Sequence, residues 1–230
     1  MAAAGAPHGT VLISDCQTGG RGRLGRSFHS PAGAGIYMSV LLRPKLSPEK
    51  LMHLTCAAGV AMCDAVELAT NIRPGIKWTN DLVVDCKKLG GILTELGLGA
   101  DGNVEYAIVG IGINCSQCAA DFPAEIRDIA TSLLLCTGKT VERAALAAKM
   151  IAALEQMAAG LAEPDETLRK YRTDCITVGQ EISLVRGDEV LHGTALDVDE
   201  AGGLVVRFAD GRVQSVTSGE VSVRGMYGYV

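Results

Sequence analysis

The chain has 230 residues, 48% hydrophobic and 20% charged, a globular composition that suffices for one large core and a small second domain. Its formal net charge of −5 argues against nucleic acid as the main partner, because nucleic-acid-binding domains usually present a basic face. Residues 1–8 lack the regions of a signal peptide, and no apolar run reaches the roughly 20 residues that span a bilayer, so we expect a cytoplasmic protein without a membrane partner.

The first three quarters of the chain predict an α+β fold in which helices pack on a mixed β-sheet. Ser47-Pro48-Glu49 is typical of a helix start, with a hydroxyl N-cap and proline at the first helical position. The helix that follows is apolar on all faces, which indicates deep burial. Apolar runs predict strands at 10–14, 36–42, 76–78, 82–85, 89–96 and 106–114, with a tight turn at Cys86-Lys87, and helices at 47–69 and between 123 and 172.

The pattern changes near Thr177, where helical periodicity ends. From Ile182 onward, short β-rich runs alternate with Gly and Asp turns, including Gly187-Asp188 and Ser218-Gly219. Such spacing predicts a small β-barrel. We therefore expect one domain over residues 1–175 and a second over residues 176–230.

The segment from Gln17 to Arg26 has the strongest functional pattern, with three arginines and four glycines in ten residues. Glycine lets a backbone approach a ligand closely, and arginine offers a rigid fork of donors for phosphate or carboxylate. The spacing fits neither a dinucleotide-binding fingerprint nor a Walker A loop, although Gly20, Gly22 and Gly25 match the former's glycines. The segment predicts a loop that wraps a polyanionic ligand, and a solvated turn is the alternative.

Two further segments place polar groups and glycines at strand ends. Lys77-Trp78-Thr79-Asn80-Asp81 is followed by Lys88-Leu89-Gly90-Gly91-Ile92-Leu93, and Gly110-Ile111-Gly112-Ile113-Asn114 lies in a buried strand. Glycines within strands mark close approach by a ligand or by another backbone. A solvated hairpin and tight strand packing are the respective alternatives.

Together, these three segments resemble the catalytic domain of the biotin–protein ligase family. The family carries a GRGRxGR loop, a KWPND motif with proline where this chain has Thr79, a K-L-[AG]-G-I-L strand and a G-x-G-x-N strand. Phe28-His29-Ser30-Pro31 is similar to the family's aromatic-x-Ser-Pro, and 218–223 resembles its small C-terminal domain. The resemblance implies a class II synthetase-like domain followed by an SH3-like barrel, in a monofunctional ligase without an N-terminal DNA-binding domain.

The resemblance implies that the enzyme adenylates biotin with ATP and Mg²⁺ and transfers it to a lysine of a biotin carboxyl carrier protein. It implies catalytic roles for Lys88 and Arg23, and Mg²⁺ near Asp81. The implied biotin-binding residues are Gln17, Gly20, Arg21, Gly22, Arg23, Lys88, Gly90 and Gly91. The implied nucleotide-binding residues are Arg23, Arg26, Phe28, Asn80, Asp81 and Asn114.

Other hypotheses remain open at this point. A lipoate–protein ligase shares the catalytic fold, a non-catalytic biotin-responsive regulator is possible, and so is a homodimer. The family's usual first strand carries a Ser-Thr pair that binds biotin, whereas residues 1–9 resemble the end of the following helix, so we expect the catalytic domain to lack that strand. The eight cysteines are expected to be free thiols, including Cys115 and Cys118, which form a lone CxxC without further zinc ligands.

Overall fold

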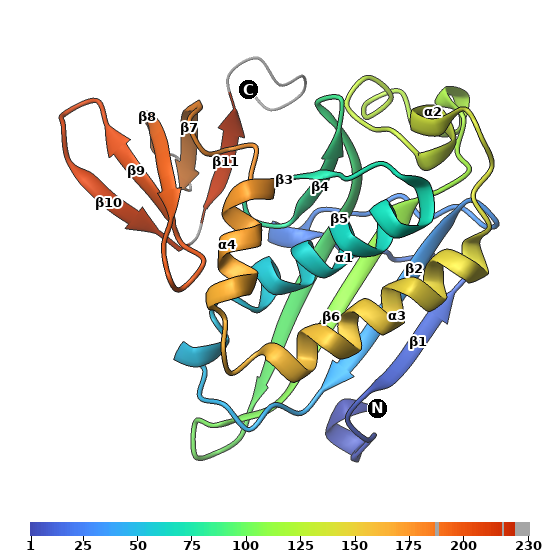
Figure 1. The fold of residues 1–230 in the computed structure, drawn as a ribbon, viewed down its shortest axis with the longest axis horizontal. Helices are drawn as coiled ribbons and strands as arrows, with labels where there is room; N and C mark the ends of the chain where they lie inside the picture. The colour runs from blue at the N-terminus through green and yellow to red at the C-terminus, as the bar shows by residue number, and fades with distance from the viewer. Residues whose placement is uncertain (187–188, 218, 224–230) are drawn as a thin grey trace.

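Two β-sheets, connected by helices, make up the part of the chain that the structure describes, residues 1–186, 189–217 and 219–223 (Figure 1). The structure is a computed structural model. The predicted α+β class is confirmed, with one sheet of six strands and another of five. The strands of the large sheet are β1 (Thr10–Ser14), β2 (Gly35–Leu42), β3 (Gly75–Lys77), β4 (Asp81–Val84), β5 (Lys87–Leu98) and β6 (Val104–Asn114).

The large sheet has the order β1-β2-β6-β5-β4-β3, and each of its strand pairs is antiparallel. The expectation of a mixed sheet is therefore wrong for these pairs, and among the described residues parallel pairing occurs only as isolated bridges such as Lys88 with Ala130. The reason is connectivity, because β3 to β6 follow one another through tight turns. Positive φ angles at Asp85 and Cys86 make the β4–β5 turn, one residue earlier than predicted.

Helices cover one face of the large sheet (Figure 1). The long first helix is buried on most faces, as predicted, but its first turn is a separate 3₁₀ segment, Glu49–Leu51, which breaks from the rest near His53. The helices are α1 (Leu54–Thr70), α2 (Leu133–Thr137), α3 (Arg143–Gly160) and α4 (Asp165–Asp174).

The segment Glu49–Thr70 is long and apolar enough to cross a membrane by length and composition, the one such helix among the described residues. This corrects the expectation that no run reaches that length. Most of the segment is buried, since α1 packs against α3, α4 and the large sheet. The apolar faces of this segment therefore pack in the hydrophobic core of the domain.

The second sheet contains β7 (Glu181–Arg186), β8 (Glu189–Val198), β9 (Leu204–Phe208), β10 (Val213–Val216) and β11 (Glu220–Val223), in the order β10-β9-β8-β7-β11. Its two outer strands, β10 and β11, do not pair with each other in the described chain, so the predicted small barrel is an antiparallel sheet that does not close among the described strands. The predicted turn at Gly187-Asp188 and the residue Ser218 lie outside the described residues.

A partly buried ion-pair cluster joins the end of α1 to the end of α4. Arg73 donates to both carboxylate oxygens of Asp174, at 2.7 and 2.6 Å, and to Asp64 and Glu67 of α1, each at 2.7 Å. The Asp174 side chain is only 6% exposed. Hydrogen bonds to Asp174, above all, raise the pKa of the Arg73 guanidinium above its ordinary value.

Arg73→Ala is therefore expected to lower the free energy of unfolding by about 3 kcal/mol, because it leaves the Asp174 carboxylate buried without its counter-charge. Urea denaturation measures the change. The matched control is Lys170→Ala, which removes a longer, exposed pair with the same Asp64 at 3.7 Å and should cost no more than about 0.5 kcal/mol. Equal effects from the two variants would contradict the stabilising role of the Arg73–Asp174 pair.

His53 lies at the start of α1, beneath a turn of the second sheet. It is 3% exposed, and its Nε2 has no hydrogen-bond partner in the described structure. Burial lowers the pKa of His53 below its usual value of about 6.5, partly opposed by a hydrogen bond to the backbone of Leu161. The unfolded chain therefore binds the proton more tightly than the folded one.

It follows that His53 favours folding above about pH 6.5 and that this contribution is lost as the pH falls from there through the lowered pKa of the folded state. We expect the free energy of unfolding to decrease below about pH 6.5, with a contribution from this residue of at most about 1.4 kcal/mol per pH unit. His53→Gln should flatten the decrease. Thermal unfolding at a series of pH values compares the two chains, and identical pH profiles would count against this role.

Candidate functional site

A row of glycines on the open face of the large sheet forms the floor of a cavity. Gly91 of β5 pairs with Gly112 of β6, and Gly110, two residues earlier in β6, pairs with Leu93. Residues that alternate along a strand share one face, so these glycines leave a depression, the glycine trough (Gly91, Gly110 and Gly112). The cavity above it has a volume of about 420 Å³.

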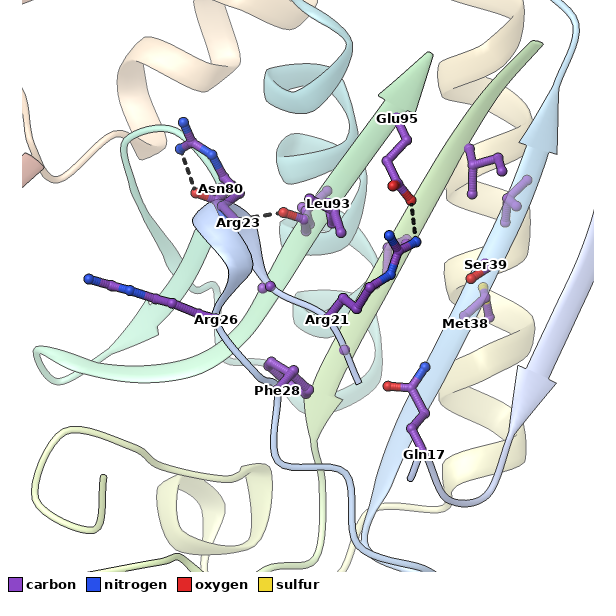
Figure 2. Close-up of a pocket in the computed structure, with 18 of the residues that line it drawn as sticks. Gln17, Arg21, Arg23, Arg26, Phe28, Met38, Ser39, Asn80, Leu93 and Glu95 are labelled. Atoms are coloured by element: carbon purple, nitrogen blue, oxygen red, sulfur yellow. Dashed lines mark hydrogen bonds and ion pairs between the residues drawn. The ribbon is translucent and has the colours of Figure 1, made fainter. Parts of the chain in front are cut away.

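Residues 17–30, the arginine loop, cover this trough on the side opposite the helices (Figure 2). Its two limbs are held together, since the Gly22 N–H donates to the Arg26 carbonyl (2.7 Å) and the Phe28 N–H donates to the Gly20 carbonyl (2.9 Å). At its tip, Leu24 and Gly25 have positive φ angles, and Leu24 is 72% exposed. The predicted loop is therefore a folded-back strap over the sheet.

Three cations of the site are each held by an acceptor from β4, β5 or the turn before β4. Arg21 pairs with Glu95 at 2.9 Å, and Lys88 with Asp81 at 2.7 Å. Arg23 donates to the Asn80 side-chain oxygen at 3.0 Å (Figure 2). Phosphate or carboxylate oxygens entering the cavity would compete for these same donors.

The backbone of Lys88 is fixed from both sides. On one side it pairs with Val83 of β4, and on the other its N–H donates to Ile129 (2.7 Å) while its carbonyl accepts from Thr131 (2.9 Å). Its side chain, 31% exposed, extends along the cavity beside Gly91, where a Cβ would come within 3.5 Å of Lys88 Nζ. The fixed backbone at the start of β5 thus positions the Lys88 ammonium beside the trough.

Contacts from α4, from the segment that follows it and from a turn of the second sheet hold the turn that precedes β4. The Trp78 N–H donates to Thr177 Oγ1 (2.9 Å), its indole Nε1 donates to the Gly202 carbonyl (2.9 Å), and the Tyr171 hydroxyl donates to the Thr79 carbonyl (3.1 Å). The Trp78–Thr79 peptide bond is cis. These contacts position Asn80, which holds Arg23.

The second sheet reaches the arginine loop through the turn that contains Gly202. This glycine has a φ of +83°, and a Cβ there would lie 2.8 Å from the sulfur of Cys56, so the turn packs closely on α1. A second cavity, of about 460 Å³, lies on the other side of the loop, between the loop, α1 and the turn at 201–203. The loop arginines therefore border both cavities.

Phe28 closes one end of the trough. A Cβ at Gly112 would lie 2.4 Å from the Phe28 ring, which means that the ring rests directly on this glycine. The ring also meets Tyr37 edge-on, with 6.4 Å between centroids, and the Tyr37 hydroxyl donates to the Pro31 carbonyl (3.0 Å). Burial raises the pKa of Tyr37 to about 12, so it stays a neutral donor.

Most of the site residues predicted from sequence come together around the first cavity, which they line from the arginine loop, the 78–81 turn and β5. These are Gln17, Arg21, Gly22, Arg23, Arg26, Phe28, Asn80, Asp81, Lys88 and Gly91.

Three predicted site residues, Gly20, Gly90 and Asn114, do not line this cavity. Gly20 packs against Phe28, and a Cβ at Gly90 would collide with the Gly112 carbonyl at 2.4 Å. Asn114 is 5% exposed, and its amide is bonded to Thr131 (2.9 Å) and Gln117 (3.1 Å). Its predicted contact with nucleotide stays a prediction, and its observed contacts hold the segment that pins Lys88.

Sequence reasoning missed Glu95 and Ser39, which both face the trough (Figure 2). Glu95 shares a strand face with Gly91 and Leu93, so alternation along β5 could have indicated it. Ser39 lies beside Gly110 only because β2 pairs with β6 in that register, which no local pattern in the sequence announces.

No group of three or more His, Cys, Asp or Glu side chains that could hold a metal ion occurs within the described ranges. The cavity carboxylates of Asp81 and Glu95 are both paired with cations. The eight cysteines are free thiols, and burial raises the pKa of Cys56 and of Cys115 to about 12, which keeps both thiols protonated and unreactive. A divalent cation would therefore have to bring most of its ligands with it.

Comparison with known families gives two matches that follow one another along the chain. The sequence model of the biotin/lipoate A/B protein ligase family matches residues 2–114, which include the arginine loop, Lys88 and the glycine trough. That of the biotin protein ligase C-terminal domain matches residues 177–224.

Individual relatives extend over nearly the whole chain. The bifunctional ligase/repressor BirA of Bacillus spizizenii is 35% identical over 220 residues, 95% of this chain and 67% of the relative. The biotin–[acetyl-CoA-carboxylase] ligase of Mycobacterium tuberculosis is 33% identical over 93% of this chain and 78% of the relative. The structure of the Aquifex aeolicus biotin protein ligase in complex with biotin and ATP superposes with a TM-score of 0.82, at 34% identity, over 96% of this chain and 90% of that chain.

Proposed function

The chain belongs to the biotin protein ligase family, and we propose on this basis that the cavity over the glycine trough is where it activates biotin with ATP. The protein is an ATP-dependent ligase that joins biotin to the lysine of a biotin carboxyl carrier protein. The observation that carries the assignment is the convergence of Arg21, Arg23 and Lys88 on one glycine-floored cavity. Cations in this arrangement suit a reaction between two anions.

In the first half-reaction, a biotin carboxylate oxygen attacks the α-phosphorus of ATP. The new P–O bond forms as the bond to the β-phosphate breaks, and pyrophosphate leaves with the electron pair. The repulsion between two anions has to be overcome by positioning and by nearby cations. Lys88 and Asp81 both lie beside Gly91 of the trough, and Lys88 would bridge the carboxylate and the α-phosphate, exchanging Asp81 for them.

The arginine loop supplies the other cations and the cover. Arg23 would turn from Asn80 to the phosphate, and Arg21 from Glu95 to the carboxylate end of biotin. Asp81 would be the protein contact of Mg²⁺ that arrives with ATP, because this ion usually keeps waters and phosphate oxygens as its other ligands. Arg26 and Phe28 would border the nucleotide, with the Phe28 ring excluding water from the adenylate.

In the second half-reaction, the carrier's lysine amine attacks the acyl carbon of biotinyl-AMP. The C–N bond forms as AMP leaves, and the amine loses its proton. The loop must open enough at its exposed tip, near Leu24, to admit the amine. The acceptor is a biotin carboxyl carrier protein. Neither nucleic acid nor membrane takes part in the proposed reaction. Residues 1–175 carry this chemistry in the proposal, and residues 176–230 form a separate domain.

The assay is pyrophosphate release by the purified chain with ATP, Mg²⁺ and biotin, with lipoate in place of biotin as the matched control. Release with biotin and not with lipoate is expected, followed by biotin transfer when carrier protein is added. Lipoate-dependent release would reassign the chain to lipoate ligation. Biotin binding without release would favour the alternative of a non-catalytic biotin-responsive protein.

A further inference from the structure

The side chain of Gln17 is held from behind by Ser30, at the far end of the arginine loop. Ser30 Oγ donates to Gln17 Oε1 at 2.9 Å, and the Gln17 backbone N–H donates to the Ser30 carbonyl at 3.1 Å. Ser30 is 5% exposed and does not line the cavity, whereas Gln17 is exposed to it, near Met38 and Ser39 (Figure 2). Ser30 can therefore act on a ligand only through Gln17.

This contact decides which end of the Gln17 amide faces the cavity. An amide has an acceptor oxygen at one end and two N–H donors at the other. Because the Ser30 hydroxyl engages Oε1, the NH₂ group is left for the cavity, and it has no hydrogen-bond partner among the residues that the structure describes. The cavity thus presents donors, rather than an acceptor, at this point.

The hydrogen bond from Ser30 to Gln17 lies in a tight space, and a second acceptor competes for the Ser30 hydroxyl. A Cβ at Gly20 would lie 2.8 Å from Ser30 Oγ and 2.9 Å from Gln17 Oε1, so only glycine leaves room for the pair. The same hydroxyl lies 3.0 Å from the Phe28 carbonyl, and it has a single hydrogen to donate. The orientation of Gln17 therefore depends on one hydroxyl and is not fixed by packing alone.

We propose that Ser30 is a positioning residue that holds the Gln17 amide with its NH₂ group toward the ureido oxygen of biotin. The inference rests on the proposed function, because it takes the cavity ligand to be biotin, whose ring is a cyclic urea. Ser30 then sets specificity. It favours a ring with an acceptor at that position over one with a donor, because two donors facing each other leave both unsatisfied.

The test compares biotin with 2-iminobiotin, in which a nitrogen donor replaces the ureido oxygen, by calorimetric titration of the full chain. Ser30→Ala is expected to weaken biotin binding roughly tenfold. Binding of 2-iminobiotin should change much less, because the released amide can turn its oxygen to that ligand. The KM for biotin should rise in step while kcat for pyrophosphate release stays unchanged, since Ser30 touches no reacting group.

The matched control is Ser14→Ala, which removes a hydroxyl that bonds to the Cys16 carbonyl and does not contact Gln17. It should leave the preference between the two ligands as in the unmodified chain. A ligand preference unchanged by Ser30→Ala overturns the proposal, whether both affinities fall equally or neither falls. Equal weakening would mean that Ser30 only supports the loop.

Gln17→Glu provides a second variant that does not depend on how the Ser30→Ala chain folds. Its carboxylate presents an acceptor to the cavity in either orientation, so it should shift the preference strongly toward 2-iminobiotin. No shift would show that Gln17 does not face the ureido oxygen, which also overturns the proposal. Failure of the unmodified chain to bind biotin at all would instead contradict the proposed function.

Discussion

Lys88→Ala is expected to slow pyrophosphate release by about 10²–10³-fold, the usual effect of losing one preorganised charged contact in the transition state. The ammonium of Lys88 lies 2.7 Å from Asp81 at the edge of the glycine trough, and its backbone is pinned by β4 and by residues 129–131. Because the backbone of Lys88 is pinned, its ammonium has only a short way to move from Asp81 to the transferring phosphate. Single-turnover measurement of pyrophosphate release gives the rate.

Lys87→Ala is the matched control, because Lys87 is the preceding residue of β5 and is exposed to solvent. It should leave the rate unchanged within about twofold, in line with the small effect of solvent-exposed charges. Thermal unfolding of both variants separates a chemical defect from a folding defect. Near-normal release by a folded Lys88→Ala chain would remove Lys88 from the catalytic role.

Arg23→Gly should release the adenylate about 10- to 100-fold faster while leaving the chain folded. A hydrogen bond to a charged group contributes about 1.5–3 kcal/mol, and the glycine also adds backbone freedom to the loop. Arg23 reaches Asn80 at 3.0 Å, so its guanidinium links the loop to the turn that the second sheet supports. Dissociation of radiolabelled adenylate after one turnover provides the rate.

Arg212→Gly is the matched control for this substitution, since Arg212 is an exposed arginine that pairs with Asp210 in a turn of the second sheet. It changes the same side chain without touching the cavity. An adenylate off-rate in Arg23→Gly that equals that of this control would mean that the loop does not clamp the product.

Local sequence patterns predicted the positions of the strands and of the arginine loop. Apolar runs located each strand of the large sheet within a few residues, and the density of glycine and arginine located the strap over the trough. They did not predict how the strands pair. The expected mixed sheet is antiparallel and the expected barrel does not close among the described strands, because pairing depends on which strands meet, a property that side-chain alternation does not encode.

By itself, the sequence determined the chemistry available to this protein: an arginine loop, a lysine at a strand start and glycines in adjacent strands. Only the tertiary structure decided the partners of these groups, because Arg23 meets an acceptor 57 residues away and Arg21 one 74 residues away. It also separated Asn114 from the cavity and brought Ser39 and Glu95 into it. The physical reason is that residue types and local spacing set which interactions a segment can make, whereas strand register and packing decide which of them form.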